Sequence, residues 1–207
     1  MILHGYFRST AAWRVRIALA LKGLDADAVP HQLLEGTQRA PDYLKINPQG
    51  LVPALILDDG AVLTQSLAIC EYLEEIQPEP PLLPGDAIMR ARIRACAMVI
   101  ACDTHPVQNL RVLGRLRGLG FEEPQVQKWG RDTIEQGFEA LDQLLAGFDG
   151  PYACGAAPTL ADLFLIPQMA NARRFGLDIR WPRLLDVETR CQSLPAFAAA
   201  VPEKAAQ

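Results

Sequence analysis

Two neighbouring hydroxyl residues stand where an apolar strand gives way to a helix. Ser9 and Thr10 follow the apolar run Met1–Leu3 and precede an apolar helical pattern closed by Gly23. The first backbone N–H groups of a helix are unpaired, and the helix dipole favours negative charge beside them. A hydroxyl here can cap the helix, or it can donate a hydrogen bond to a bound anion. The residues by themselves leave both interpretations open.

A second polar pair, Gln65 and Ser66, opens another helical pattern. Asp59 and Gly60 between two apolar runs predict a β-hairpin, and the pair follows the second strand of that hairpin. Two hydroxyl-bearing helix starts in one small α/β unit predict a site for a ligand with more than one anionic group.

The elements that must position these pairs follow the order strand–helix–strand and then strand–strand–helix. A second strand is predicted over Asp27–Leu33, and a short helix around Pro41–Leu44. A turn then leads into a strand headed by Pro53, which lacks an N–H and is tolerated at that place. The Val52–Pro53 bond is a candidate for a cis peptide. We expect an α/β domain over residues 1–80.

A proline-rich linker, residues 78–86, ends this pattern, with four prolines in the seven residues Pro78–Pro84. Residues 87–207 predict an all-helical domain without strands. Its first helical pattern, 87–113, contains Pro106, which should kink it or split it in two. The next begins at Pro124, a capping box at Thr159–Asp162 opens a buried helix, and a last stretch, 183–201, is interrupted near Pro195.

Composition excludes several functions. A net charge of −4 argues against a general nucleic-acid binder, and no apolar run approaches the roughly 20 residues of a membrane span. The first residues lack the pattern of a signal peptide, and the cysteines form no Cys-x-x-Cys pair. We therefore expect a cytoplasmic protein with reduced thiols. The three histidines are scattered without ligand spacing, so we expect no metal.

Several motifs in order along the chain resemble those of zeta-class glutathione transferases, a family that includes maleylacetoacetate isomerases. Bacterial maleylpyruvate isomerases share the same layout, including a Cys-Asp-x-His-Pro stretch like Cys102–Pro106. The resemblance covers nearly the whole chain. The matching segments are Tyr6-Phe7-Arg8-Ser9 with Trp13–Leu19, Asn47-Pro48 with Val52-Pro53, Gln65–Ile69, Leu82–Pro84, His105-Pro106 with Asn109–Arg111, Ala161-Asp162, Pro167-Gln168 with Arg174-Phe175, and Leu194–Phe197.

This resemblance implies a thioredoxin-like N-terminal domain, a helical C-terminal domain and glutathione as the cofactor. It implies that Ser9 holds and activates the glutathione thiol, with Thr10 as the next candidate. Further glutathione-binding residues follow by position: Val52 and Pro53, whose backbone would pair with the cysteinyl unit, Gln65 and Ser66 for the γ-glutamyl carboxylate, and His105.

The reaction implied is cis–trans isomerisation of a dicarboxylic diketo acid in aromatic amino acid catabolism, by a homodimer. The substrate carboxylates need cations, and the candidates are Arg8, Arg111 and Arg174, because an arginine fork matches a carboxylate. Without the resemblance, Arg111 and Arg174 are equally interpreted as surface or ion-paired residues. His105 beside Pro106 is equally interpreted as satisfying a helix kink.

One segment departs from the family pattern, because this chain reads Ser9-Thr10-Ala11 where Ser-Ser-Cys is usual, so that Thr10 replaces a serine and Ala11 a cysteine. That cysteine serves the reductive dehalogenases of the group, so its loss argues against their activity. Glutathione conjugation or haloacid dehalogenation is an alternative function, and an inactive transferase-like binding protein is another.

The remaining singled-out residues have structural interpretations. Arg14 and Arg16, two positions apart on a helix, are expected at the surface or at subunit contacts. The apolar stripe with Trp129 and Phe138 is expected in the core, and Cys102 is expected to be a packing residue.

Overall fold

The computed structural model describes residues 1–205, which form two compact units. The first unit comprises Met1–Pro81 and the segment that begins at Gln192, and the second comprises Leu82–Cys191. The sequence predicts 87–207 as one domain, whereas the structure groups the C-terminal segment with the first unit. The reason is that the helix α9 (Pro195–Ala199) packs on α1, where Arg16 Nε donates to the carbonyl of Ala200 at 3.1 Å.

The first unit is built on a four-stranded sheet with the order β2-β1-β3-β4. The strands are β1 (Ile2–Gly5), β2 (Asp27–Pro30), β3 (Ala54–Ile56) and β4 (Val62–Thr64). Strands β1 and β2 are parallel, as a helical crossover requires, while β1–β3 and β3–β4 are antiparallel. This arrangement confirms the predicted hairpin and the thioredoxin-like α/β fold.

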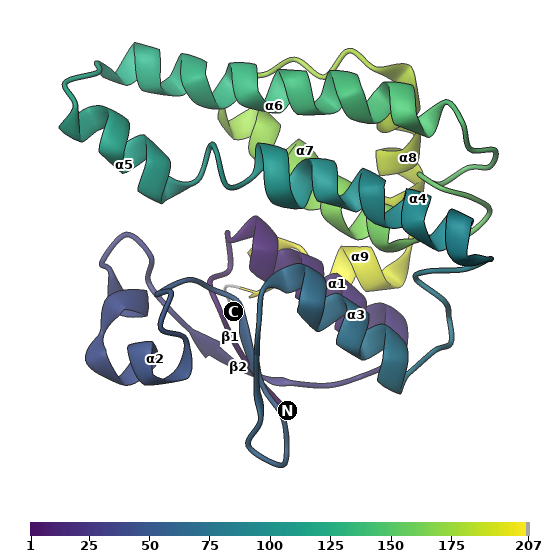
Figure 1. Ribbon diagram of the computed structural model, residues 1–207, viewed down its shortest axis with the longest axis horizontal. Helices are drawn as coiled ribbons and strands as arrows, with labels where there is room; N and C mark the ends of the chain where they lie inside the picture. The colour runs from purple at the N-terminus through teal and green to yellow at the C-terminus, as the bar shows by residue number, and fades with distance from the viewer. Residues whose placement is uncertain (206–207) are drawn as a thin grey trace. The chain divides into compact units, whose positions relative to one another are not determined.

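Helices cover both sides of this sheet (Figure 1). The helices α1 (Thr10–Lys22) and α3 (Ser66–Ile76) lie together on one side, and α2 (Pro41–Ile46) lies on the other, after a short 3₁₀ turn, η1 (Thr37–Arg39). A buried ion pair joins α1 to α3, because Lys22 Nζ lies 2.5 Å from the Glu74 carboxylate. Two short helices, α9 and α10 (Pro202–Ala205), complete the described part of this unit.

The predicted second strand is shorter than expected, because β2 ends at Pro30 rather than Leu33. The backbone N–H of His31 still donates to the carbonyl of Gly5 at 2.7 Å, but the chain then turns through Gly36, whose φ is +77°. A proline cannot donate to a neighbouring strand, so β2 serves as an exposed edge strand.

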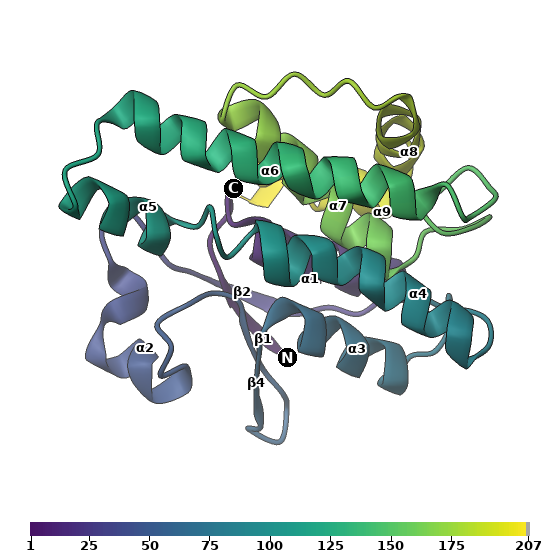
Figure 2. The same ribbon diagram turned by 45° about the horizontal axis from the view of Figure 1, so that its top comes forward.

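The second unit contains helices, and within its described residues the only strand-like pairing is an isolated bridge between Tyr152 and Gly155. Figure 2 shows the long α6 running beside α4 and α5. The helices are α4 (Ala87–Met98), the π-helix η2 (Val99–Thr104), α5 (Leu110–Gly118), α6 (Glu123–Leu145), α7 (Leu160–Arg174) and α8 (Pro182–Gln192).

The helix α7 forms the core of the second unit, as its apolar pattern predicts. Every residue from Leu160 to Met169 is buried, and the predicted capping box at Thr159 and Asp162 is present. A helix that is apolar on all sides is stable in water only when neighbours cover it on all sides. Here α4 and η2 pack against it.

The first helix of this unit ends where Pro106 predicts, but its last turn is a π-helix. The backbone N–H of His105 donates to the carbonyl of Ile100, five residues back, at 2.8 Å. This widened turn packs closely on α6 at Gly137, where an added Cβ would lie 2.1 Å from Thr104 Oγ1. Only glycine permits that approach, and π-turns are frequent at functional sites.

Candidate functional site

Three segments that carry predicted site residues meet at one end of the sheet in the first unit. The register pairs His4 with Ala54 and Ala54 with Thr64 across three neighbouring strands. The chain beyond β1 leads to Ser9, the chain before β3 holds Val52–Pro53, and the chain beyond β4 leads to Gln65. Strand pairing therefore places these segments side by side, although they are far apart in the sequence.

Ser9 is the N-cap of α1, with extended backbone angles. Its Oγ accepts a hydrogen bond from the backbone N–H of Ala12 at 3.2 Å, so the capping interpretation is correct. A hydroxyl that accepts one bond still carries a proton to donate, and no residue of the described chain accepts it. Ser9 is half-buried, so this proton is available to a ligand beside the helix end.

The two neighbours of Ser9 differ in exposure. Arg8 is exposed in the turn before the helix and directly precedes Ser9 in the chain. Thr10 is 4% exposed, and its Oγ1 is buried without a hydrogen-bond partner in the described chain. Solvent therefore reaches Arg8 and part of Ser9, whereas Thr10 is buried.

The Val52–Pro53 peptide is cis, as expected from the sequence. The chain before it is held by two side chains that the sequence did not single out. Tyr43 Oη donates to the carbonyl of Leu51 at 2.6 Å, and the buried Asn47 donates to the same oxygen from Nδ2 at 2.7 Å. These bonds fix the backbone beside Val52, and the only sequence signal for them was the Asn-Pro turn.

Gln65 adopts a backbone conformation that is rare outside glycine, with φ at +68°. Such strain persists only where the surroundings impose it, and it is concentrated at functional sites. The side chain of Gln65 makes no capping bond to α3, and its Nε2 donates to Gln49 Oε1 at 2.9 Å. The N-terminal N–H groups of α3 thus lack a side-chain cap from Gln65.

The expectation of a place at the surface was wrong for Arg14, whereas Arg16 is half-buried and its expected subunit contact stays a prediction. Arg14 is 2% exposed and donates from Nη1 to Ser66 Oγ at 3.1 Å, while Arg16 donates to the carbonyls of Phe7 and Ala200. Burial lowers the pKa of Arg16 to about 10, which leaves it charged at neutral pH. The Arg14–Ser66 bond brings the N-terminal turns of α1 and α3 together.

The second unit carries the other predicted residues. His105 is half-buried at the end of η2, Arg111 is exposed in the first turn of α5, and Arg174 is exposed at the last position of α7. Asn171 Nδ2 donates to Gln108 Oε1 at 3.0 Å, which joins the turn after His105 to the last turns of α7. The structure thus connects the chain segments of these three residues within one unit.

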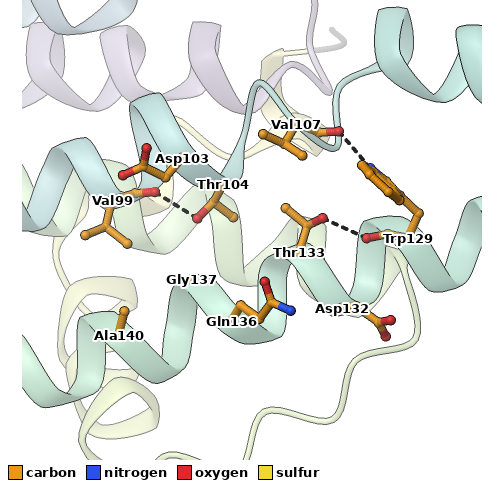
Figure 3. A pocket seen from close by; sticks show the side chains of 10 residues that line it. All are labelled: Val99, Asp103, Thr104, Val107, Trp129, Asp132, Thr133, Gln136, Gly137 and Ala140. Atoms are coloured by element: carbon orange, nitrogen blue, oxygen red, sulfur yellow. Dashed lines mark hydrogen bonds between the residues drawn. The ribbon is translucent and has the colours of Figure 1, made fainter.

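A cavity of about 490 Å³ lies between η2 and α6 in the second unit (Figure 3). Its walls include Thr104, Val107 and Trp129. Phe138 is fully buried as expected, but Trp129 is 44% exposed, so the expectation that it belongs to the core was wrong. Its indole Nε1 donates instead to the carbonyl of Val107 at 3.1 Å.

Two of the buried thiols, Cys70 and Cys191, are poor nucleophiles. Burial raises the pKa of Cys70 to about 12, and burial together with neighbouring groups raises the pKa of Cys191. A thiol with such a pKa stays protonated at neutral pH. Cys102 is exposed, which contradicts the expectation that it packs in the interior. Cys102 lies within η2, whose buried residues are Ile100 and Thr104.

Residues 1–205 contain no cluster of three metal-ligating side chains. In the same residues, no helix combines the length and apolar character that crossing a lipid bilayer demands.

Comparisons with known proteins match this architecture. The model of the glutathione S-transferase N-terminal domain matches residues 8–76, and that of the C-terminal domain matches residues 106–190. The chain belongs to the glutathione S-transferase family. It is 47% identical to the maleylacetoacetate isomerase of Pseudomonas aeruginosa over 98% of this chain and 96% of that protein.

Two solved structures of glutathione S-transferases are similar along nearly their whole length. One is a zeta-class bacterial maleylpyruvate isomerase, with a TM-score of 0.95, 41% identity, and coverage of 99% of this chain and 98% of the other. The second is the maleylacetoacetate isomerase of Methylobacterium extorquens with bound malonate and glutathione, with a TM-score of 0.95, 40% identity, and coverage of 99% and 97%. The chain therefore groups with the zeta-class isomerases of the family.

Proposed function

We propose that this transferase catalyses the glutathione-dependent cis–trans isomerisation of maleylacetoacetate or maleylpyruvate. The observation that carries the proposal is the meeting of Ser9, Val52 and Gln65 at one end of the sheet. These segments offer the donor set that a tripeptide thiol with two carboxylates requires. Bound glutathione supplies the thiolate that adds to the double bond and leaves again after rotation about the single bond.

Ser9 donates a hydrogen bond from its hydroxyl to the sulfur, which stabilises the thiolate. A free thiol with a pKa of about 8.5 is only a few per cent thiolate at neutral pH. A hydroxyl donor and the N-terminus of α1 both stabilise the anion and lower that pKa. Ala11 offers no second thiol at this helix start, which disfavours chemistry that must resolve a mixed disulfide.

Gln65 and Ser66 hold the γ-glutamyl carboxylate at the start of α3. The strained backbone of Gln65 turns its side chain away from capping, so the helix N-terminus remains open to an anion. Arg14 reinforces the positive potential there through its bond to Ser66. The backbone of Val52, which follows the Leu51 carbonyl held by Tyr43 and Asn47, pairs with the cysteinyl unit.

Arg8, Arg111 and Arg174 bind the substrate carboxylates, and His105 contacts glutathione. All three arginines are exposed, and Arg8 directly precedes Ser9 in the chain. A similar enzyme binds the dicarboxylate malonate together with glutathione, which supports a dicarboxylate substrate. Fixed cations of this kind also stabilise the charge that develops on the substrate oxygen.

We further propose that the protein is a homodimer that acts in the cytoplasm, in aromatic amino acid catabolism. One face of α4 exposes an apolar stripe at helical spacing, with Ile88 72% and Met98 39% exposed and Ala91 and Ala95 between them. A second copy is the partner proposed to cover it. Sedimentation of wild type and Ile88→Asp checks this, since the dimer should weaken in the variant.

The decisive experiment follows the absorbance of maleylacetone, a surrogate substrate, and of maleylpyruvate with and without glutathione. Wild type is compared with Ser9→Ala, Arg8→Ala and the control Arg39→Ala, which removes an exposed arginine elsewhere in the first unit. Turnover that requires glutathione and collapses in the first two variants only is the expected result.

Two outcomes contradict the proposal in different ways. If neither compound is turned over while calorimetry shows glutathione binding, a conjugating transferase replaces the isomerase. If glutathione does not bind, only the fold assignment survives.

A further inference from the structure

We propose that Trp129 and Asn171 are positioning residues that fix the turn His105–Asn109, and thereby the placement of His105 and Arg111 toward the substrate. The inference rests on the proposed function, in which these two residues contact glutathione and a substrate carboxylate. The turn, α6 and α7 all belong to the second unit, so the argument concerns contacts within that unit alone.

Trp129 holds the middle of the turn from the side of α6. Its indole Nε1 donates to the carbonyl of Val107 at 3.1 Å, and Figure 3 shows the ring reaching from α6 toward that carbonyl. Almost half of the side chain is exposed, so burial does not account for a tryptophan here. The hydrogen bond to the turn is a specific task that only its N–H performs.

Asn171 holds the end of the turn from the side of α7. Its Nδ2 donates to Oε1 of Gln108 at 3.0 Å, and Gln108 is only 3% exposed. The Nε2 of Gln108 has no hydrogen-bond partner among the described residues, so the bond from Asn171 sets the orientation of this amide. Arg174 follows Asn171 by three residues, on the same side of the helix. The hydrogen bond between Asn171 and Gln108 therefore links the turn to α7, the helix that carries Arg174.

The cavity explains why these two bonds matter. Thr104 and Val107 line a space of about 490 Å³, so apolar packing does not fix the turn on that side. Segments with sparse packing open locally at low cost in free energy. Removing a fixed hydrogen bond there lets the backbone of the turn move, and a displacement of about 1 Å can change a rate by about 100-fold.

The test uses Trp129→Phe, Asn171→Leu and the double variant of the full chain. Phenylalanine keeps a ring without the N–H, and leucine keeps the shape of asparagine without the donor. Hydrogen exchange of residues 105–111, the dissociation constant of malonate with glutathione present, and kcat and KM for maleylacetone are measured for each. Thr133→Val is the control, because it removes a hydroxyl from α6 one turn away and leaves both bonds intact.

We expect faster exchange at 105–111 in each single variant and most in the double variant. In the double variant, KM and the malonate dissociation constant should rise by about 10-fold, with a smaller fall in kcat, because the turn no longer presents its side chains in one geometry. Thr133→Val should match wild type in every readout. The exchanged pair Gln108→Asn with Asn171→Gln keeps a donor and an acceptor at the same combined length. Its exchange rates, KM and malonate affinity should therefore lie closer to wild type than those of Asn171→Leu.

Unchanged exchange in the double variant overturns the proposal, since the bonds then do not hold the turn. Faster exchange with unchanged KM and malonate affinity overturns it too, because the turn then does not position the site. A wild-type chain that turns over neither substrate overturns the proposed function alone, as exchange and malonate binding test the positioning role without turnover.

Discussion

The helices α1 and α7 both begin with a hydroxyl residue at the N-cap, but the two hydroxyls have different surroundings. Ser9 accepts one backbone bond, is half-buried and retains a proton without an acceptor in the described chain. Thr159 is 1% exposed and donates its proton to the carboxylate of Asp162 at 2.9 Å. The same signal at a helix start thus leaves a hydroxyl proton available in one place and stabilises the core in the other.

What separates the two helix starts is whether their polar groups satisfy one another. Asp162 accepts hydrogen bonds from the backbone of Ala153 and Thr159 and from the thiol of Cys191. Burial raises the pKa of this carboxyl, and these bonds lower it by less. A saturated, buried network has nothing left to offer a ligand, whereas an incompletely used cap does.

Removing Asp162 from the hydrogen-bonded start of α7 should have the largest effect, a loss of stability. Asp162→Ala leaves buried N–H donors at Ala153 and Thr159 unpaired, and we expect it to lower the free energy of unfolding by about 3 kcal/mol. For a chain of this size the midpoint of thermal unfolding falls by about 6–12 °C. Calorimetry measures it, with Asp186→Ala as the exposed control in the same unit. A loss below about 1 kcal/mol would contradict the saturated-network account.

Substitution of Ser9 at the start of α1 should lower activity more than stability. We expect Ser9→Ala to lower kcat/KM by about 100-fold, because a donor to the developing anion is lost. The cost in unfolding free energy should be about 1 kcal/mol, from the cap. Thr159→Ala should instead lower the free energy of unfolding, while the fraction of the protein that is folded retains the wild-type kcat/KM. Equal effects of the two substitutions on activity would remove the distinction.

Substitution of the third hydroxyl, that of Ser66, should affect activity less than substitution of Ser9 and more than substitution of Thr159. The reason is that the Ser66 oxygen already accepts a hydrogen bond from Arg14. Ser66→Ala removes a donor from the start of α3, and we expect the dissociation constant of glutathione to rise by about 10-fold. Turnover at saturating glutathione should change little, since the sulfur is held elsewhere. Titration calorimetry measures the affinity. A large fall in kcat instead would assign Ser66 to the reacting group.

A smaller effect is expected on the pH dependence of stability, through His4 in β1, the strand before α1. His4 Nδ1 and His31 Nε2 lie 2.9 Å apart, and burial lowers the pKa of both rings below 6.5. The unfolded chain therefore binds more protons than the folded one below pH 6.5, so stability falls as the pH decreases through that range. Thermal midpoints between about pH 5 and 8 measure the slope. His31→Asn should reduce it, and an unchanged slope would exclude the pair as its source.

Local patterns were sufficient for most elements. The apolar periodicity around Ile17, the Asp59-Gly60 turn and the Thr159 capping box each involve residues close in sequence, so they predicted α1, the hairpin and the start of α7 correctly. The motif resemblance predicted the family, because separated motifs in one order are specific to it. The roles of Arg8, Arg111 and Arg174 stay predictions, and the Arg8→Ala variant tests the first of them.

Only the tertiary structure decided which of these residues are buried and which are joined. Arg14 and Trp129 show this: a polar residue lies inside because Ser66 accepts from it, and an aromatic residue is half exposed because it bonds a turn. Partners 52 and 22 residues apart leave no trace in local periodicity. The sequence by itself determined the elements and the family, since these follow from short-range preferences and motif order. Burial and pairing depend on how distant segments pack, and only the folded chain specifies them.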